Sequence, residues 1–278
     1  MIKRLARRIL GEARYLELVK FKDSRKADQL YREWAATAAG GVVQERLRAL
    51  RNRHHGRRAF VIGNGPSLNA MDLTLLRDDV TIGCNGLFLH FDKMGWVPTY
   101  YTVEDKLVAE DRGRQIAAIK GTTKLIPLDV QKQVPDRDAL WINFLREYPG
   151  FPKFSHDFPA RAYWGGTVTY LNIQLAVHLG CNPIYLIGVD HNYKTDFEIK
   201  KEGGRWTSLE ADPNHFHPDY FGKGYRWHDP NVARMEQCYL HARSECDRLG
   251  IEIINATVGG RLEVFPRNHY TRLPFASL

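Results

Sequence analysis

Short apolar runs rich in branched residues recur along the chain, and most end in glycine, asparagine or aspartate. Such runs are typical of strands buried on both faces of a parallel sheet. Between most of them lie stretches whose apolar residues have helical spacing. We expect strands at 59–63, 80–84, 98–103, 124–128, 140–144, 183–189 and 251–254, and helices at 67–76, 106–120, 168–179 and 229–249. This alternation predicts a Rossmann-like α/β fold with a doubly wound, mostly parallel sheet.

The N-terminal part of the chain differs from the rest in charge. Residues 1–58 hold 16 of the 40 Lys and Arg but only 6 of the 32 Asp and Glu. Near-helical spacing predicts one basic amphipathic helix over 2–20 and a second helix over 28–50, broken near Gly40-Gly41. We therefore predict a basic helical extension over 1–58 and a Rossmann-like main domain over 59–278. The extension fits contact with an anionic membrane face, and equally packing on the core or on a second subunit of a homo-oligomer.

Composition narrows the cellular setting. The four cysteines form no CxxC pair, so buried or free thiols in a reducing compartment are expected. No apolar run approaches the roughly 20 residues that span a bilayer. No long apolar stretch follows the basic amino terminus, as it would in a signal peptide. We expect a cytoplasmic protein, peripheral at the inner membrane face if the extension binds lipid. Residues 59–278 are nearly neutral in charge, which argues against a nucleic-acid partner.

The glycine-rich turn Gly63-Asn64-Gly65-Pro66-Ser67 follows the first predicted strand. Glycine allows a tight turn and close approach to a ligand, and proline suits the first turn of a helix. Backbone amides at a helix start favour phosphate. The turn is neither the dinucleotide motif nor a Walker loop. We predict a phosphate-binding loop, with an ordinary strand-to-helix turn as the alternative.

Further polar residues follow the other predicted strands. Ligands in such sheets bind beyond the carboxyl ends of the strands, so these residues are expected to share one crevice. Asp190 could bind ribose, orient a base or hold a metal ion, or it could simply cap a helix. The candidates, including a second glycine-rich helix start with Thr167 as its cap, are Asn85, Glu104, Asp105, Gly165, Gly166, Thr167, Asp190 and Tyr193.

Residues 191–228 are polar and aromatic and lack clear periodicity, which is typical of a functional lid. His228 at its end is predicted to be a general base, because an imidazole can accept a proton near neutral pH. Tyr193 and Tyr225 are candidate phenolic donors to a phosphate, or packing aromatics. A zinc site from His215, His217 and His228 is disfavoured, since no thiolate or HExxH motif accompanies them.

In their order, these motifs resemble the bacterial sialyltransferases that extend lipooligosaccharide and capsule. The shared features are GNGPSL, the Cys84-Asn85 pair, a Gly/Thr helix start, the strand IYLIGVD, a lid and a histidine. The chain is also similar to the MptE-like (6-hydroxymethylpterin diphosphokinase-like) family, in which GNGPSL, GG[ST]V and a PI-x-LIG-x-D strand recur. Both resemblances cover roughly residues 57–267.

The sialyltransferase resemblance implies an inverting glycosyltransferase of polysaccharide biosynthesis that needs no metal. Asn64, Gly65, Ser67 and Asn85 match positions that hold cytidine monophosphate (CMP), Tyr193 and Tyr225 match lid tyrosines, and His228 matches the base. The donor would be a nucleotide-activated sugar, such as a CMP-linked nonulosonic acid, and the acceptor a glycan or lipid-linked hydroxyl. The MptE-like resemblance implies instead a diphosphokinase of a pterin or other small alcohol. Its Mg²⁺ and ATP would be held by Glu104, Asp105 and Asp190.

Overall fold

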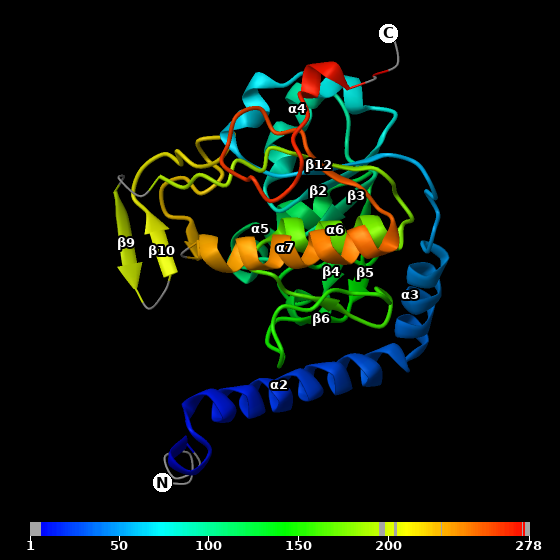
Figure 1. Ribbon diagram of the computed structural model, residues 1–278, viewed down its shortest axis with the longest axis vertical. Coiled ribbons are helices and arrows are strands. Elements are labelled where there is room, and N and C mark those ends of the chain that lie inside the picture. The colour runs from blue at the N-terminus through cyan, green and yellow to red at the C-terminus, as the bar shows by residue number, and fades with distance from the viewer. Residues whose placement is uncertain (1–6, 195–197, 203–204, 229, 274, 276–278) are drawn as a thin grey trace.

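The computed structural model describes residues 7–194, 198–202, 205–228, 230–273 and 275. Their main feature is a seven-stranded sheet whose neighbouring strands all run parallel (Figure 1). Each predicted strand is present in it, and the predicted fold class is confirmed. In spatial order the strands are β12 (Ile253–Asn255), β8 (Ile184–Ile187), β1 (Ala59–Ile62), β2 (Val80–Cys84), β3 (Tyr100–Thr102), β4 (Thr123–Pro127) and β5 (Leu140–Ile142).

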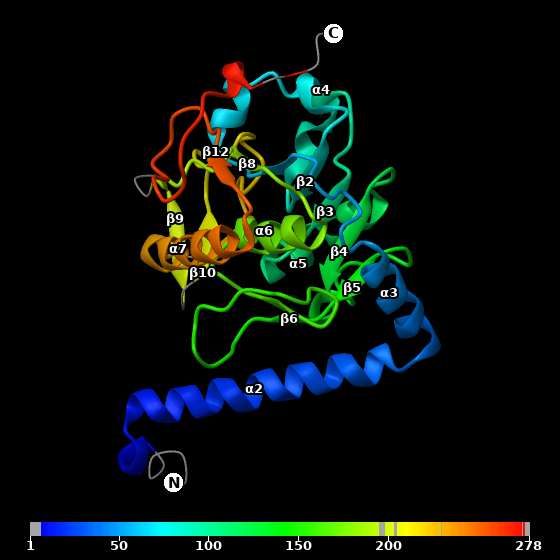
Figure 2. The same ribbon diagram turned by 45° about the vertical axis from the view of Figure 1, so that its right-hand side comes forward.

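The two faces of the sheet bury separate apolar clusters. Along β1, Ala59 and Val61 contribute to one cluster and Phe60 and Ile62 to the other. The first face is covered by α3 (Ala38–Ala49), α6 (Val168–His178) and α7 (Val232–Leu249), with α6 and α7 side by side (Figure 1 and Figure 2). The second is covered by α4 (Phe91–Met94), α5 (Lys106–Ala118) and 3-10 turns at Pro66–Ala70, Leu73–Leu76, Leu87–His90, Leu128–Val130 and Tyr270–Arg272.

Helices predicted from the pattern differ at two places. The helix expected at 67–76 is two 3-10 turns, separated by extended backbone at Met71. The break expected at Gly40-Gly41 lies instead at Ala36-Thr37, where the Thr37 hydroxyl accepts a hydrogen bond from the Gly40 amide and caps α3. Gly40 lies inside α3, and only glycine fits there, because a Cβ would meet the Trp34 carbonyl oxygen at 2.2 Å. The glycine therefore serves close approach of two helices.

The N-terminal extension is a long helix that stands apart from the sheet. α2 (Glu12–Ala35) runs across one end of the molecule, and α3 joins it to the main body (Figure 2). Residues 7–10 are helical, but Gly11, at φ 74°, separates them from α2. α2 itself carries six Lys and Arg against five Asp and Glu, so the basic excess lies mostly outside it. Residues 1–6, where the predicted basic helix begins, lie outside the described residues, as does residue 229 at the start of another predicted helix.

Two small sheets accompany the large one. β6 (Phe144–Leu145) pairs with β7 (Ala162–Tyr163), while β9 (Ile199–Glu202), β10 (Arg205–Ser208) and β11 (Arg226–His228) form an antiparallel sheet. The latter lies within the segment for which no regular structure was expected. Its strands escaped the pattern because they are short and mostly exposed, and only Trp206 and Trp227 bury their rings, 4.8 Å apart.

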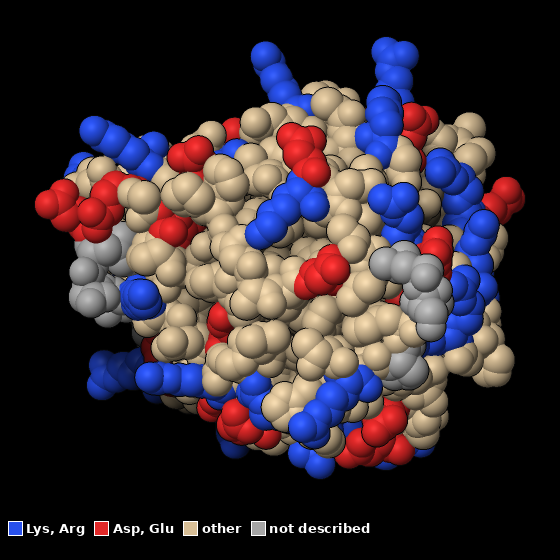
Figure 3. Space-filling model, turned by 90° about the horizontal axis from the view of Figure 1, so that it is seen from above, with Lys and Arg blue, Asp and Glu red and all other residues tan. Residues whose placement is uncertain are grey.

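Charge is mixed on the face of the molecule seen in Figure 3. Lys and Arg side chains stand mainly around its margin, interspersed with Asp and Glu, and its middle is mostly uncharged. This agrees with the nearly neutral sequence of residues 59–278. Within the described ranges, no helix combines the length and the apolar character needed to cross a membrane.

Asp28 attaches α2 to the main body. Its carboxylate accepts hydrogen bonds from Asn143 Nδ2 at 2.7 Å and Arg161 Nη2 at 3.3 Å, while the neighbouring Tyr31 hydroxyl donates to the Trp141 carbonyl at 2.8 Å. Asp28 and Tyr31 are buried, whereas the first half of α2 is mostly exposed.

We predict that Asp28→Ala lowers the free energy of unfolding by about 1–3 kcal/mol, because it removes a charged acceptor from the buried Asn143 amide. Urea unfolding measures the loss, and limited proteolysis should cut α2 more rapidly. Asp23→Ala on the exposed side of the same helix is the control. Equal stability of both variants would contradict the assignment.

Candidate functional site

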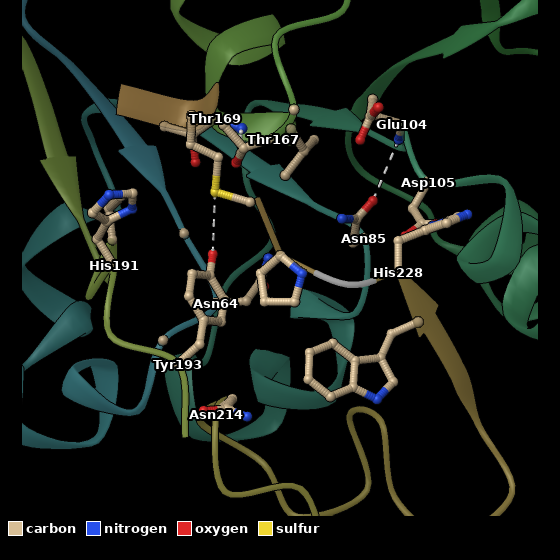
Figure 4. Close-up of a pocket in the computed structure, with 18 of the residues that line it drawn as sticks. Asn64, Asn85, Glu104, Asp105, Thr167, Thr169, His191, Tyr193, Asn214 and His228 are labelled. Carbon is tan, nitrogen blue, oxygen red and sulfur yellow. Dashed lines mark hydrogen bonds and ion pairs between the residues drawn. The ribbon is translucent and has the colours of Figure 1, made fainter. Parts of the chain in front are cut away.

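A cavity of about 650 Å³ lies beyond the carboxyl ends of β1, β2, β3 and β8, next to the small sheet β9–β11. This is where the strand order reverses, because β2 and β8 lie on opposite sides of β1. Figure 4 shows side chains from strand ends, helix starts and the long segment before α7 around it. The predicted residues that line it are Gly63, Asn64, Gly65, Asn85, Glu104, Asp105, Gly166, Thr167, Asp190, Tyr193 and His228.

Four predicted residues do not line this cavity: Pro66, Ser67, Gly165 and Tyr225. Pro66 begins the first 3-10 turn. Gly165 lies against the Tyr170 ring, where a Cβ would come within 2.3 Å of Cδ1. The Tyr225 ring packs on the Arg112 guanidinium at 4.0 Å. Tyr225 is therefore a packing aromatic, which was the other interpretation of its sequence position.

The anion expected at the turn after β1 is supplied by the protein itself. The Ser67 hydroxyl and backbone amide donate to the Asp190 carboxylate at 2.7 and 3.2 Å. The fit is close, because a Cβ on Gly65 would lie 1.8 Å from Asp190 Oδ2. Burial raises the pKa of Asp190, and the bonds from Ser67 oppose the rise. We therefore revise the predicted phosphate loop: Asp190 is a capping carboxylate, and Ser67 is committed to it.

The glycines of this turn serve contact between two chain segments. The Gly63 amide donates to the Ile187 carbonyl at 2.7 Å and the Gly65 amide to the Gly188 carbonyl at 2.8 Å. A Cβ on Gly63 would meet the Gly188 carbonyl oxygen at 2.3 Å. Asn64 is buried, and its Nδ2 donates to Cys84 Sγ at 3.2 Å. Among the described residues its Oδ1 has no hydrogen-bond partner, so Asn64, which lines the cavity, holds an unsatisfied buried acceptor.

One side of the cavity carries two adjacent carboxylates. Asn85, at φ 48°, accepts from the Glu104 amide through Oδ1, which fixes the end of β3. The Glu104 carboxylate lies 3.6 Å from Arg146 Nη1. Burial raises the pKa of Glu104 to about 7, and the positive charge of Arg146 limits the rise. Asp105 caps α5 by accepting from the Leu107 amide at 2.7 Å.

Asp105 also binds the predicted base. His228 Nδ1 lies 3.2 Å from Asp105 Oδ2, although 123 residues separate them in sequence. The hydrogen bond to Asp105 raises the pKa of His228, and burial opposes this rise. The His228 side chain keeps about half of its surface exposed, at 54%, so a ligand can reach it. Figure 4 places His228, Asp105, Glu104 and Asn85 together on one side of the cavity.

The opposite side is formed by the chain after β8 (Figure 4). His191, at φ 51°, places Nε2 3.3 Å from Glu236. Burial raises the pKa of Tyr193 to about 12, so its hydroxyl stays protonated and donates weakly to the sulfur of Met235 at 3.7 Å. Thr167 caps α6 by accepting from the Thr169 amide, as predicted.

Sequence reasoning missed several lining residues. Arg146 and Glu147 follow the strand expected at 140–144 and Trp164 precedes the second glycine-rich helix start, so no predicted motif includes them, and Arg234 lines the cavity from α7. His191 could have been found, because it directly follows Asp190 at a strand end. The remaining missed residues with polar or aromatic side chains include Lys106, Asn214, Tyr220, Phe221 and Trp227, and His215, considered above only as a zinc ligand, also lines the cavity.

The three carboxylates predicted to hold a metal ion each have a partner within the protein. Asp190 is bonded to Ser67, Glu104 faces Arg146 with a raised pKa, and Asp105 is shared by the α5 cap and His228. In the part of the chain that the structure describes, no three His, Cys, Asp or Glu side chains are grouped to hold a metal ion. The carboxylates as arranged do not fit a Mg²⁺ site.

The sequence of the chain matches one known protein family. Residues 36–196 match the family model described as 6-hydroxymethylpterin diphosphokinase MptE-like. The chain belongs to this MptE-like family. No curated protein matches it in sequence.

Solved structures share the fold at low identity. The MAf glycosyltransferase from Magnetospirillum magneticum AMB-1 is 15% identical with a TM-score of 0.50, and the match covers 84% of this chain and 39% of that one. The sialyltransferase CstII from Campylobacter jejuni, in complex with cytidine-5'-monophosphate, is 16% identical with a TM-score of 0.44, covering 77% and 85%. A mammalian sialyltransferase is 10% identical with a TM-score of 0.37, covering 86% of both chains. The likeness to MAf establishes a shared fold, and this chain spans well under half of that protein.

We predict that Glu104→Gln changes how stability depends on pH. The folded protein favours protonated Glu104, so its contribution to stability is full below about pH 4.5 and is lost as pH rises through about 7. The variant should match wild type near pH 4.5 and exceed it at pH 8 by up to about 3 kcal/mol. Urea unfolding at both pH values measures this. Glu147→Gln, which alters an exposed carboxylate of the same cavity, should show no such divergence.

Proposed function

We propose that this chain transfers a sugar from a nucleotide-activated donor to an acceptor hydroxyl, with inversion and with His228 as general base. The observation that carries the proposal is the pairing of His228 with Asp105 beside the cavity at the strand ends. A histidine whose Nδ1 is held by a carboxylate is oriented to accept a proton at Nε2. The fold shared with a glycosyltransferase supports this class of reaction.

The nucleotide is proposed to lie along the ends of β1, β2 and β8. Asn64 offers a buried, unpartnered acceptor there, and Asn85, Thr167 and Tyr193 line the same space. A volume of about 650 Å³ suits a nucleotide-sized ligand. A CMP-linked nonulosonic acid is the donor that the sequence resemblance favours, and a glycan or lipid-linked acceptor would enter beside His228.

The proposed reaction places its groups on opposite sides of the sugar. The His228 side of the cavity faces the side formed by Asn64 and Tyr193 (Figure 4). The acceptor oxygen loses its proton to His228 Nε2 and bonds to the anomeric carbon. The bond from that carbon to the donor phosphate breaks, and the electron pair leaves with the phosphate. Asp105 stabilises the imidazolium that forms, because its charge lies 3.2 Å from Nδ1.

Residues 191–228 are proposed to act as the lid of a transferase domain spanning 59–278. Helix α5 holds this segment at two further places: Arg226 pairs with Glu110 and Asp111, and Arg112 donates to the Asp219 and Tyr220 carbonyls. Closure would exclude water, which competes with the acceptor. Contact of the extension 1–58 with a membrane face or a second subunit stays a proposal.

The MptE-like family favours a second candidate, a diphosphokinase that uses ATP and Mg²⁺. The three carboxylates that would hold Mg²⁺ are each engaged elsewhere, so we derive no step through a metal ion. The diphosphokinase would bind ATP with Mg²⁺, whereas the glycosyltransferase would bind a nucleotide-activated sugar.

We predict that His228→Ala lowers transfer about 10²- to 10⁴-fold, because it removes the proton acceptor, while nucleotide affinity stays within a few-fold of wild type. Donor turnover by chromatography and nucleotide titration measure the two effects. Asp105→Asn should shift the rising limb of the rate–pH profile to lower pH, since the hydrogen bond to Asp105 raises the pKa of His228. His217→Ala, outside the cavity lining, is the control. Full turnover by His228→Ala would overturn the assignment.

We predict that CMP, alone among CMP, UDP, GDP and ATP, raises the melting temperature substantially, with or without Mg²⁺, because a ligand of the native state stabilises it by mass action. Transfer should survive EDTA. A stabilisation by ATP that appears only with Mg²⁺, together with activity lost in EDTA, would favour the diphosphokinase instead.

A further inference from the structure

The phosphate of a bound nucleotide lacks the donors that the sequence seemed to offer. The Ser67 amide and hydroxyl are bonded to Asp190. Two of the cationic side chains at the cavity, Lys106 and Arg146, are paired with Asp129 at 3.0 and 2.7 Å. The third, Arg234, packs its guanidinium over the Phe151 and Trp164 rings. Phosphate charge that grows as a sugar departs would be stabilised by a further donor close to the end of β1.

His215 is held rigidly in the cavity wall. Its Nδ1 lies 2.7 Å from Asp212 Oδ2, and its ring stacks on that of Tyr220 with centroids 4.0 Å apart and planes 1° apart. The Phe221 ring meets it edge-on at 5.1 Å. Asp212 is itself fixed, because it accepts from the Asn214 and Phe221 amides at 2.8 and 2.9 Å. A ring restrained on several sides is prepared to bind without further ordering.

Asp212 supplies a permanent negative charge behind this ring. Its side chain is only 3% exposed. Burial alone would raise the pKa of Asp212, but the hydrogen bond and charge of His215 and the two backbone amides lower it, so the carboxylate stays ionised. Because an ionised carboxylate only accepts hydrogen bonds, Nδ1 of His215 is the donor to Asp212. Nε2, for which the described residues provide no hydrogen bond, is the ring atom left for a ligand.

The segment carrying His215 is bonded directly to the turn after β1. The amide of the next residue, Phe216, donates to the Asn64 carbonyl at 3.0 Å, and its carbonyl accepts from Asn69 Nδ2 at 2.7 Å. The Tyr220 ring beneath His215 packs against Gly86 at the end of β2. His215 is thus carried by residues that contact the ends of both β1 and β2.

We propose that His215, oriented by Asp212, binds the phosphate of the nucleotide through Nε2. This inference rests on the proposed function and adds to it a residue on the leaving-group side. His215 makes and breaks no covalent bond: it acts as the imidazolium, which donates Nδ1–H to Asp212 and Nε2–H to a phosphate oxygen, and the second bond strengthens as that oxygen gains charge. Two histidine–aspartate pairs then serve opposite partners, His228 the acceptor hydroxyl and His215 the phosphate.

The test compares a nucleotide with its nucleoside. His215→Asn keeps an amide that can donate to Asp212 but removes the end of the ring that faces the cavity. CMP and cytidine are titrated calorimetrically into wild type and variant. We expect CMP affinity to fall about 10- to 100-fold, as for loss of a charge-assisted hydrogen bond, and cytidine affinity to stay unchanged. Asp212→Asn, which keeps the shape and removes the charge, should weaken CMP about 10-fold. His217→Asn, on the same segment but outside the cavity lining, is the matched control.

Each result decides one point. Equal losses for CMP and cytidine in His215→Asn would mean that the residue only shapes the wall, and unchanged CMP affinity would mean that it does not reach the phosphate; either overturns this inference and leaves the proposed function standing. Wild-type protein that binds neither CMP nor UDP would overturn the proposed function, and this inference with it. Circular dichroism and the melting temperature confirm that the variants are folded.

Discussion

The close approach of the chain after β1 to the chain after β8 determines the geometry of the whole cavity. The amides of Gly63 and Gly65 are bonded to carbonyls across this junction, and no Cβ fits on either residue. The Asp190 carboxylate then accepts a hydrogen bond from the Ser67 hydroxyl, so this hydroxyl is no longer available to a ligand. Since these backbone donors are used to join the two strands, the floor of the cavity is fixed but offers few amides of its own. Ligand recognition must come from side chains around that floor.

Those side chains come from two parts of the chain. Strand ends contribute Asn64, Asn85 and the Glu104-Asp105 pair, which the parallel sheet gathers at one edge. The segment before α7 contributes two histidines, and each meets a carboxylate on reaching the cavity. A rigid floor and ionisable groups carried by the segment before α7 would suit the proposed transfer, in which a proton moves to His228. The same arrangement leaves the carboxylates committed to cationic or amide partners.

The sequence predicted the fold and the edge of the sheet where the cavity lies, because buried parallel strands have a distinctive pattern and their ends must converge. It also predicted that Asp105 and His228 belong to one site, but their contact joins residues far apart, and pattern alone cannot pair them. The role of Ser67 was misjudged for the same reason: its partner comes from another strand. The break between α2 and α3 was placed at the glycines, whereas a threonine cap and close helix packing decide it.

Helix α5 connects the two halves of this arrangement. Its first turn is capped by the same aspartate that orients His228, and its middle holds Arg226 and the carbonyls of Asp219 and Tyr220. Lifting the covering segment away would therefore separate the histidine from its carboxylate. If residues 191–228 act as the proposed lid, the open form would lack the His228–Asp105 pair, and transfer of the donor sugar to water would be slow in that form.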